Sequence, residues 1–504
     1  MIARLTSIFC MMGGAVCADP LFEDITAALP DHQYTGGWEH FVGGGVSAFE
    51  CSADGRPDLV AAGGTSPMIL LKNVSETGKI AFDEVSLAGE ITGVTGAYPV
   101  DIDGDGVLDL YVMRVGPDRV LQGGPDCTFT DVTARWNIPQ TDQWTTAFTA
   151  WWDTGARFPT LAVGHYVDRT NPDGPFGTCD TQTILNPQDG GTPSYRAELL
   201  TPGFCTLSML ASSDARGRKS LRISNDRHYY VSGGSEQLWD IRDRRFLTAD
   251  DGWDTVSLWG MGIASRDLNG DKRDELMLTS MGDQLMQIAQ ADGRYIGAPY
   301  DIGTYAHNPY IKGDGRPSTG WHASFADVNN DGRADLFIAK GNVDQMPGMA
   351  MRDPNNLLIQ GKDGRFAEAG GVAGVADTAR SRGAALADFD SDGRLDLVVV
   401  NRRAPMRLYR NVTPDAGNAV QVLAIGAGGN HFAVGARVIV TADDHQQSQQ
   451  ITIGGGHAGA VAGPLHFGIA AAKTAVVQVQ WPDGSLGDMG DVLAGETILI
   501  EQPN

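Results

Sequence analysis

Asp388-Phe-Asp-Ser-Asp-Gly-Arg-Leu-Asp396 is the stretch of sequence that decides the fold, because it recurs along the chain. It aligns without gaps with residues 101–109 and 327–335. Residues 267–275 form a fourth copy, which differs mainly at the sixth and ninth positions. Each copy leads directly into a short apolar run, such as Leu397–Val400, which is typical of a β-strand. A unit of this kind that repeats at a regular spacing predicts a repeat architecture.

The segments between these loops have the content of propeller blades. A strand of small residues precedes each loop, and further short strands complete a unit of four. Incomplete copies of the loop at 50–58, 152–160 and 212–220 keep a spacing of about 50 to 60 residues. The sequence therefore predicts an all-β chain with a seven-bladed β-propeller, and six or eight blades are the alternatives.

The last repeat unit lacks a fourth strand, because its strand pattern ends at residues 409–412. Near the N-terminus, Phe22-Glu-Asp-Ile-Thr26 has the pattern of the missing strand. Pairing these two segments would close the ring and remove two exposed sheet edges. We therefore predict that the first strand of the chain completes the last blade.

The repeated loop carries the oxygen donors of a calcium site. Positions one, three, five and nine are Asp, Asn or Glu, and the residue at position seven can add its backbone carbonyl. The predicted ligands are Asp101, Asp103, Asp105, Val107 and Asp109; Asp267, Asn269, Asp271, Arg273 and Glu275; Asp327, Asn329, Asp331, Arg333 and Asp335; and Asp388, Asp390, Asp392, Arg394 and Asp396. Oxygen donors in this number favour Ca²⁺ over Mg²⁺, which keeps its waters. The alternative is that each Asp-Gly pair only makes a hairpin turn.

The four loops are not equivalent, because Lys272 replaces glycine at the sixth position of loop 267–275 and places a positive charge in the turn. We therefore predict three complete calcium sites and an incomplete fourth one. Extracellular modules of this kind bind calcium with dissociation constants of roughly 10⁻⁴–10⁻³ M. Its expected role is to stabilise the folded state.

Composition limits the classes of partner. The 504 residues carry a formal net charge of −24, which repels phosphate backbones and disfavours nucleic acid as a ligand. The chain is not an acidic disordered polymer, because 42% of its residues are hydrophobic.

The N-terminus has the features of an export signal. Arg4 supplies a positive charge, residues 5–16 are mostly apolar, and Val16 and Ala18 fit a cleavage site before Asp19. We therefore predict a signal peptide at residues 1–18 and a periplasmic or extracellular mature protein. No later apolar run reaches about 18 residues, so no transmembrane segment is expected in the mature chain.

Four cysteines remain after the predicted cleavage, namely Cys51, Cys127, Cys179 and Cys205. An even number in an exported protein favours two disulfides, for which three pairings are possible. We favour Cys179–Cys205, because both lie in a loop-rich segment interpreted as an insertion near 165–210, and Cys51–Cys127 by elimination. Free buried thiols are the alternative.

The chain changes character after residue 416. Residues 438–441, 449–453 and 476–481 are short runs rich in β-branched side chains, and the last two partly alternate between apolar and polar residues. We therefore predict a propeller at 19–416 and a small β-sandwich-like domain at 417–504.

The motifs of both parts resemble known families. The repeated loop is similar to the core of FG-GAP/VCBS repeats, and Asn430–Val438, Gly454–His457, Leu465–Gly468 and Trp481–Gly484 resemble the ASPIC/UnbV domain. Together they resemble the cartilage acidic protein family, including its bacterial members. The family has no generally established catalytic activity, so the resemblance implies binding or adhesion at most. Ile469-Ala470 and His457 depart from the family pattern and leave any site in that domain undefined.

The sequence contains no P-loop, no dinucleotide-binding turn, no His-Glu-x-x-His and no Gly-x-Ser-x-Gly. The leading hypothesis is a non-enzymatic, calcium-binding adhesion or interaction module with a protein or glycan ligand. The alternative is a carbohydrate-active enzyme, a lyase or dehydratase, on the same propeller. That alternative requires His, Tyr, Arg or Lys residues clustered at one mouth of the channel, and the positions of His228, His307 and His322 test it.

Overall fold

The structure is a computed structural model that describes residues 18–171, 177–213, 218–226, 234–305 and 315–503. Almost all of its regular structure is β-strand, and α1 (Gly370–Ala373) is the one α-helix among those residues. The predicted signal peptide lies outside the described part of the chain, apart from Ala18. No helix in the described part is long and apolar enough to cross a membrane.

The strands form successive four-stranded antiparallel sheets, as expected for propeller blades. The first three blades comprise β2 (Val46–Phe49), β3 (Asp58–Ala61), β4 (Ile69–Asn73) and β5 (Phe82–Val85); β6 (Val94–Val100), β7 (Asp109–Arg114), β8 (Arg119–Gly123) and β9 (Phe129–Asp131); and β10 (Thr145–Trp151), β11 (Thr160–His165), β12 (Gln182–Pro187) and β13 (Tyr195–Leu200). The next three comprise β14 (Thr206–Ser213), β15 (Lys219–Asn225), β16 (Gln237–Asp240) and β17 (Arg245–Phe246); β18 (Gly260–Arg266), β19 (Glu275–Ser280), β20 (Leu285–Ala289) and β21 (Tyr295–Gly297); and β22 (Gly320–Ala326), β23 (Asp335–Lys340), β24 (Asn356–Gln360) and β25 (Phe366–Glu368).

The last blade is completed by the first strand of the chain, as predicted. β26 (Arg380–Ala387), β27 (Asp396–Arg402) and β28 (Arg407–Asn411) are followed in the sheet by β1 (Phe22–Asp24), which pairs antiparallel with β28. Phe22 lies opposite Asn411 in this register. The inner strands β2, β6, β10, β14, β18, β22 and β26 contact one another in turn, and β26 contacts β2, so the ring is closed. The all-β propeller prediction is confirmed.

The segment 165–210 is not the strand-poor insertion that the sequence suggested. It contains β12 and β13, the two outer strands of the third blade, which pair along their whole length. The strand pattern was hidden because β13 reads Tyr-Arg-Ala-Glu-Leu-Leu, a run rich in helix-forming residues. Packing against the neighbouring strand overrides that preference.

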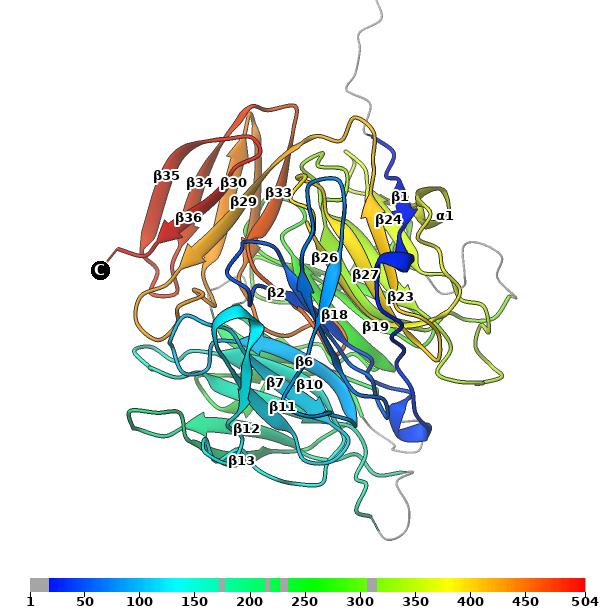
Figure 1. Ribbon diagram of the computed structural model, residues 1–504, viewed down its shortest axis with the longest axis vertical. Coiled ribbons are helices and arrows are strands. Elements are labelled where there is room, and N and C mark those ends of the chain that lie inside the picture. The colour runs from blue at the N-terminus through cyan, green and yellow to red at the C-terminus, as the bar shows by residue number, and fades with distance from the viewer. Residues whose placement is uncertain (1–17, 172–176, 214–217, 227–233, 306–314, 504) are drawn as a thin grey trace, which may run out of the picture.

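A second body of strands follows the propeller. It contains β29 (Asn418–Ile425), β30 (Arg437–Ala442), β31 (His445–Gln450), β32 (Val461–Ala462), β33 (Leu465–Ala470), β34 (Thr474–Gln480), β35 (Leu486–Leu493) and β36 (Thr497–Glu501). The sheets β33-β29-β36 and β31-β30-β34-β35 share a core that includes Val422, Val438, Phe467 and Trp481. Figure 1 shows these strands, in orange and red, at one side of the propeller.

The chain between β31 and β33 enters the central channel of the propeller, and we call residues 451–463 the channel segment. Within it, Ile453 pairs with Ala150 on β10, Gly454 with Leu210 on β14, and Gly456 with Ile263 on β18. β32 then pairs in parallel with the inner strand β2. The sequence alone did not predict this connection.

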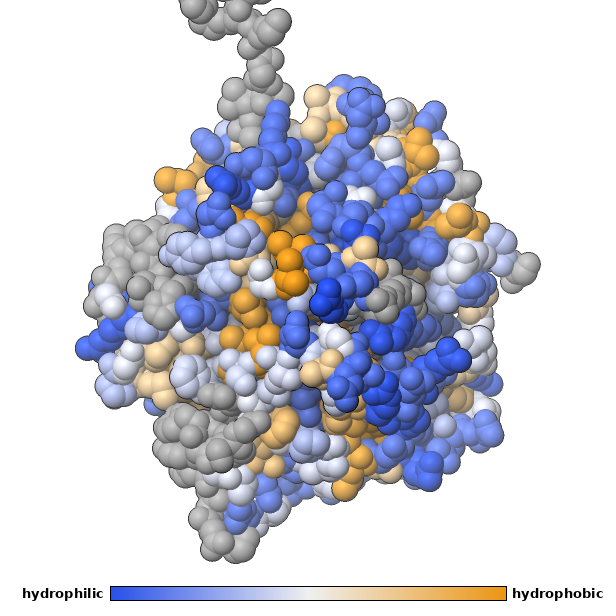
Figure 2. Space-filling model, turned by 180° about the vertical axis from the view of Figure 1, so that it is seen from behind, coloured by the Kyte–Doolittle hydropathy of each residue, from blue (hydrophilic) through white to orange (hydrophobic). Residues whose placement is uncertain are grey.

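The outer surface is predominantly polar. Figure 2 shows the face behind that of Figure 1, on which hydrophobic residues occur in small patches surrounded by hydrophilic ones. Such scattered apolar residues are normal for a protein surface.

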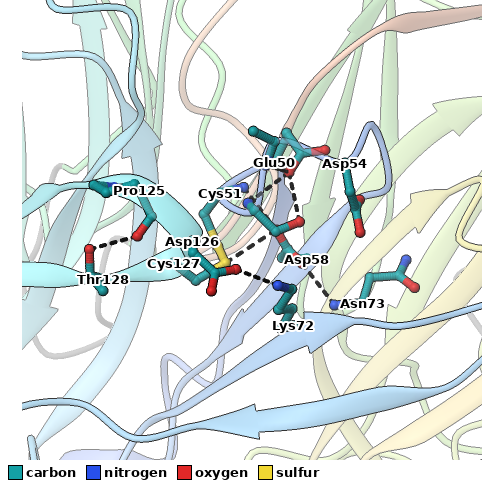
Figure 3. Close-up of a disulfide and its surroundings, with 12 residues drawn as sticks. Glu50, Cys51, Asp54, Asp58, Lys72, Asn73, Pro125, Asp126, Cys127 and Thr128 are labelled. Atoms are coloured by element: carbon teal, nitrogen blue, oxygen red, sulfur yellow. Dashed lines mark hydrogen bonds and ion pairs between the residues drawn. A yellow bond between two sulfur atoms is a disulfide. The ribbon is translucent and has the colours of Figure 1, made fainter.

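Two disulfides join Cys51 to Cys127 and Cys179 to Cys205, as favoured from the sequence. Figure 3 shows the first, which ties the loop after β2 to the turn between β8 and β9 in the next blade. Two disulfides fit a protein that works outside the reducing cytosol.

Removing the second disulfide is expected to destabilise the fold moderately. The double variant Cys179→Ser, Cys205→Ser should lose roughly 3–4 kcal/mol, because the unfolded chain regains the freedom of a long loop. Urea unfolding of the wild type and the variant, both in calcium, measures the difference. An unchanged midpoint would show that packing alone fixes this segment.

Candidate metal centre

The carboxylate at position one organises each predicted calcium loop. Asp101 accepts backbone N–H groups from Gly104 at 2.8 Å, Asp105 at 3.2 Å and Gly106 at 3.0 Å. Asp267, Asp327 and Asp388 accept the N–H groups of the fifth and sixth residues of their own loops in the same way. These hydrogen bonds therefore curve the loop backbone around the carboxylate without the help of an ion.

The carboxylate at position nine connects the loop to the blade. Asp109 accepts the N–H of Ile102 at 2.9 Å and that of Gly123, at the end of β8, at 2.8 Å. Asp335 and Asp396 bridge the second loop residue and the third strand in the same way. This position is thus buried and structural in every complete loop, in addition to any role as a ligand.

Two positions of the loop require a left-handed backbone, and the sequence analysis identified one of them. Position four has φ of 72° at Gly104, 57° at Asn330 and 55° at Ser391. The signal that could have revealed it is the use of Gly, Asn and Ser there, since Gly and Asn tolerate this conformation best. At position six Lys272 adopts φ 66° and its side chain is exposed, so the lysine does not fill the turn.

In two loops the acidic side chains converge. Ligand atoms of Asp101, Asp103 and Asp109 lie within 4.8 Å of one another. Those of Asp388, Asp390 and Asp396 do the same. Loops 267–275 and 327–335 carry Asn at position three, whose amide oxygen is the corresponding donor. The structure thus brings positions one, three and nine together.

Position five lies outside those two carboxylate groups. Its carboxylate accepts the N–H two residues ahead, as in Val107 N–H to Asp105 at 2.9 Å. In the other three loops the arginine at position seven also contacts it, through the pairs Arg273–Asp271, Arg333–Asp331 and Arg394–Asp392. These arginines neutralise part of the loop charge, and in the last blade Arg410 also pairs with Asp390 at position three, at 2.9 Å.

Unsatisfied oxygens test whether a cation fits these loops. Among the described residues, Asp103 Oδ1, Asp390 Oδ1 and Glu275 Oε1 are buried without a hydrogen-bond partner. Their second oxygens are engaged, for example Asp103 Oδ2 by the amide of Gln122 at 2.6 Å. A buried charged oxygen without a partner is costly. An oxygen-seeking cation would satisfy all three, so the donor set fits Ca²⁺.

Burial raises the pKa of several carboxylates in these loops, which also favours a bound cation. It raises the pKa of Asp101 to about 7, that of Asp109 to about 8 and that of Asp388 to about 6. The cause is the loss of water around the ionised form, which backbone hydrogen bonds only partly offset. The charged form of these loops is therefore costly by itself, and a positive ion among the oxygens would favour it.

Comparison with known proteins shows which families the chain resembles. Residues 52–112 and 327–399 match an FG-GAP-like repeat, and residues 426–504 match the ASPIC and UnbV domain. Cartilage acidic protein 1 of Xenopus tropicalis is 24% identical over 516 residues, which cover 94% of this chain and 75% of that protein. The resemblance to the cartilage acidic protein family is thereby confirmed. The Mus musculus member is 22% identical over 518 residues, covering 94% of this chain and 76% of that protein.

Among solved structures, that of BBS1N in complex with ARL6DN is similar, with a TM-score of 0.47 and 11% identity over 79% of this chain and 98% of that chain. The repeat and domain matches suggest a β-propeller interaction module. They also suggest a non-catalytic repeat-domain protein.

A fifth loop of the chain keeps the same conformation. Glu50 Oε1 accepts N–H groups from Ser52 at 2.8 Å and Ala53 at 2.7 Å, while Glu50 Oε2 is buried without a partner. Asp58 accepts the N–H groups of Cys51 and Asn73, both at 2.8 Å (Figure 3). From the sequence this loop was predicted to be incomplete, because Ser52 stands at position three. The acidic residues at positions one, five and nine were the sequence signal that this loop keeps the conformation of the others.

The second domain docks on the loops. Arg437 forms a two-pronged ion pair with Asp274, at 2.8 and 2.9 Å. Further interdomain hydrogen bonds join Ser448 to Asp267 at 2.6 Å, Gln421 to Asp388 at 3.1 Å and His466 to Asn330 at 2.7 Å. The candidate metal loops are therefore also the platform for the ASPIC and UnbV domain.

The alternative enzyme reading placed three histidines at one mouth of the channel, and the structure describes only His322 among them. This residue is buried in the channel, where its Nδ1 accepts the backbone N–H of His457 at 3.0 Å. His457 is itself satisfied by Gly43 N–H and the carbonyl of Met261. His228 and His307 lie outside the described residues.

Proposed function

We propose that this protein is an exported, calcium-stabilised β-propeller that acts as a non-enzymatic binding or adhesion module. The observation that carries the calcium assignment is the set of buried, partnerless carboxylate oxygens in loops of one shared backbone conformation. The family matches support the binding role.

Calcium is the ion that these residues suit best. Carboxylate, amide and carbonyl oxygens supply many hard donors in a flexible loop, which is the preference of Ca²⁺. Asp101, Asp103 and Asp109 would hold it in the second blade, and Asp388, Asp390 and Asp396 in the last. When bound, the ion supplies positive charge and fixes the loop geometry.

The position of the loops indicates a structural role for the ion. Asp388 contacts Gln421, and Asp267 contacts Ser448, so the acidic residues are shared with the second domain. An ion that orders these side chains also orders the surface on which that domain docks. Calcium would therefore hold the two domains together.

The location and the ligand complete the proposal. Extracellular calcium is abundant enough to fill sites of the expected affinity. The two disulfides and the predicted signal at 1–18 support export to the periplasm or beyond. With the loops occupied by structural ions, the opposite face of the propeller is the surface available to a protein or glycan ligand.

Asp388→Ala is expected to remove about one bound ion per chain. The substitution deletes the carboxylate that shapes the loop and takes part in its acidic group. A calorimetric calcium titration of the full chain measures the stoichiometry. Asp363→Ala is the matched control, because Asp363 lies in an Asp-Gly turn between β24 and β25 outside the repeated loops. Equal stoichiometry for Asp388→Ala and wild type would show that this loop binds no calcium.

A further inference from the structure

Four arginines gather at the end of the propeller that faces away from the metal loops. The loops join β22 to β23 and β26 to β27 at one face, so the start of β26 and the ends of β23 and β27 lie at the other. Arg380 and Arg382 are at the start of β26, and Arg402 and Arg403 are at the end of β27. Asp344 follows β23 at the same end.

Three of these arginines share one carboxylate. Arg402 Nη1 lies 2.7 Å from Asp344 Oδ1, Arg403 Nη1 3.4 Å and Arg380 Nη1 3.8 Å. Arg382 is fully buried and donates instead to backbone carbonyls, such as those of Phe41 and Val343. Carbonyls satisfy its hydrogen bonds without cancelling its charge.

The local charge is therefore positive on a strongly acidic protein. Three guanidinium groups share one aspartate, whereas the whole chain carries −24. The nearby carboxylates Glu39 and Asp142 are both paired with Arg169. Arginines held beside low-dielectric protein are screened less than exposed ones. A negatively charged group is attracted to this point and repelled by most of the remaining surface.

An aromatic side chain adjoins the exposed part of this cluster. The side chain of Arg403 is 45% exposed, and its Nη2 donates to the carbonyl of Gly36 at 2.8 Å. Two residues further, Trp38 is 42% exposed and is held edge-to-face against Trp144 with ring centroids 5.2 Å apart. The segment that carries this indole is therefore held by the same guanidinium through the carbonyl of Gly36.

We propose that this arginine surface (Arg380, Arg402, Arg403, Asp344 and Trp38) binds a carboxylate-bearing sugar within a sparsely charged glycan. The guanidinium of Arg403 matches a carboxylate with two parallel hydrogen bonds. The indole of Trp38 offers a flat apolar face to the C–H side of the sugar ring. A glycan with isolated carboxylates avoids the long-range repulsion that a polyanion would meet from an acidic protein.

This inference rests on the proposed binding role but uses none of the metal loops. The test is a calorimetric titration of the calcium-loaded full chain with cellobiuronic acid and with cellobiose, which differ only in the carboxylate. Cellobiuronic acid is expected to bind at least about tenfold more tightly, the effect of one charge-assisted contact. Higher salt should weaken its binding and leave that of cellobiose unchanged.

Variants separate the two contacts. Arg403→Ala should weaken cellobiuronic acid binding about tenfold, and Arg403→Lys should restore only part of it, because lysine keeps the charge without the fork. Trp38→Ala should weaken both sugars. Arg294→Ala is the matched control, since Arg294 is 58% exposed and pairs with Asp292 elsewhere on the surface. Melting curves in calcium confirm that each variant is folded.

Three outcomes would overturn the proposal. The first is equal affinity for the two sugars, or no binding of either. The second is wild-type affinity of Arg403→Ala for cellobiuronic acid. The third is tight binding of tri-glutamate that Trp38→Ala does not affect, which would indicate a peptide site. A chain that keeps its calcium but binds no uronate would refute this inference alone. A chain that binds no calcium would refute the proposed function instead.

Discussion

Chelation of calcium is expected to lower the melting temperature of this protein by about 4–8 °C. Each filled loop stabilises the folded state by the linkage relation, which gives about 1.4–2.7 kcal/mol at about 10 mM calcium for dissociation constants of 10⁻⁴–10⁻³ M. Three loops together contribute about 4–8 kcal/mol. A chain of this length has an unfolding entropy of roughly 1 kcal/mol per degree, which converts that sum into the stated shift.

The measurement is scanning calorimetry of the full chain in about 10 mM calcium and in excess chelator at one pH. Magnesium at the same concentration is the control for ionic strength, and should restore little of the loss because it keeps its waters. The chelated state should also expose the second domain to proteases first, since that domain rests on the loops. Identical melts with calcium and with chelator would refute the stabilising role.

Gly96→Ala is expected to displace the channel segment and cost about 3.5–5 kcal/mol. A Cβ built on Gly96 would lie 1.9 Å from the carbonyl oxygen of Ala458, so backbone must move. The displaced segment would lose the burial of Ile453 and Ala458 and the hydrogen bonds of Gly455 and Gly456 to inner-strand carbonyls, both 2.7 Å. A buried isoleucine contributes about 1.5–3 kcal/mol and each hydrogen bond about 1.

Denaturant unfolding in calcium measures this loss, and limited proteolysis shows where the chain opens. Cleavage should begin within residues 451–463. Gly463→Ala is the matched control, because a Cβ there would meet no atom within 4 Å and the residue lies at the end of the same segment. A Gly96→Ala protein as stable and as protease-resistant as the control would show that the channel segment contributes little to the fold.

The repeat determined most of what could be predicted from the sequence. Each acidic loop marks the end of one strand and the start of the next, so Asp109, Asp335 and Asp396 fall on the first residue of β7, β23 and β27. The closing strand was equally readable, because Phe22–Asp24 repeats the pattern that the last unit lacks. These features depend on neighbours close in sequence or on a pattern that recurs.

Features that depend on distant partners were not predictable. Gly454–Gly456 reads as a flexible loop, yet its backbone pairs with Leu210 and Ile263, roughly 200 residues earlier. Nothing in a glycine run identifies the strand edge that it will meet. The arginine surface was hidden for the same reason, since Arg380, Arg402 and Asp344 become neighbours only when two blades pack together.

Anomalous diffraction from crystals grown in calcium tests the central claim most directly. The account predicts anomalous peaks within loops 101–109, 327–335 and 388–396, each in contact with the carboxylates or amide of positions one, three and nine. A peak in 267–275 or 50–58 would extend the same pattern. An anomalous map with no peak in any of these loops, from crystals grown in enough calcium to fill sites of the expected affinity, would contradict the account.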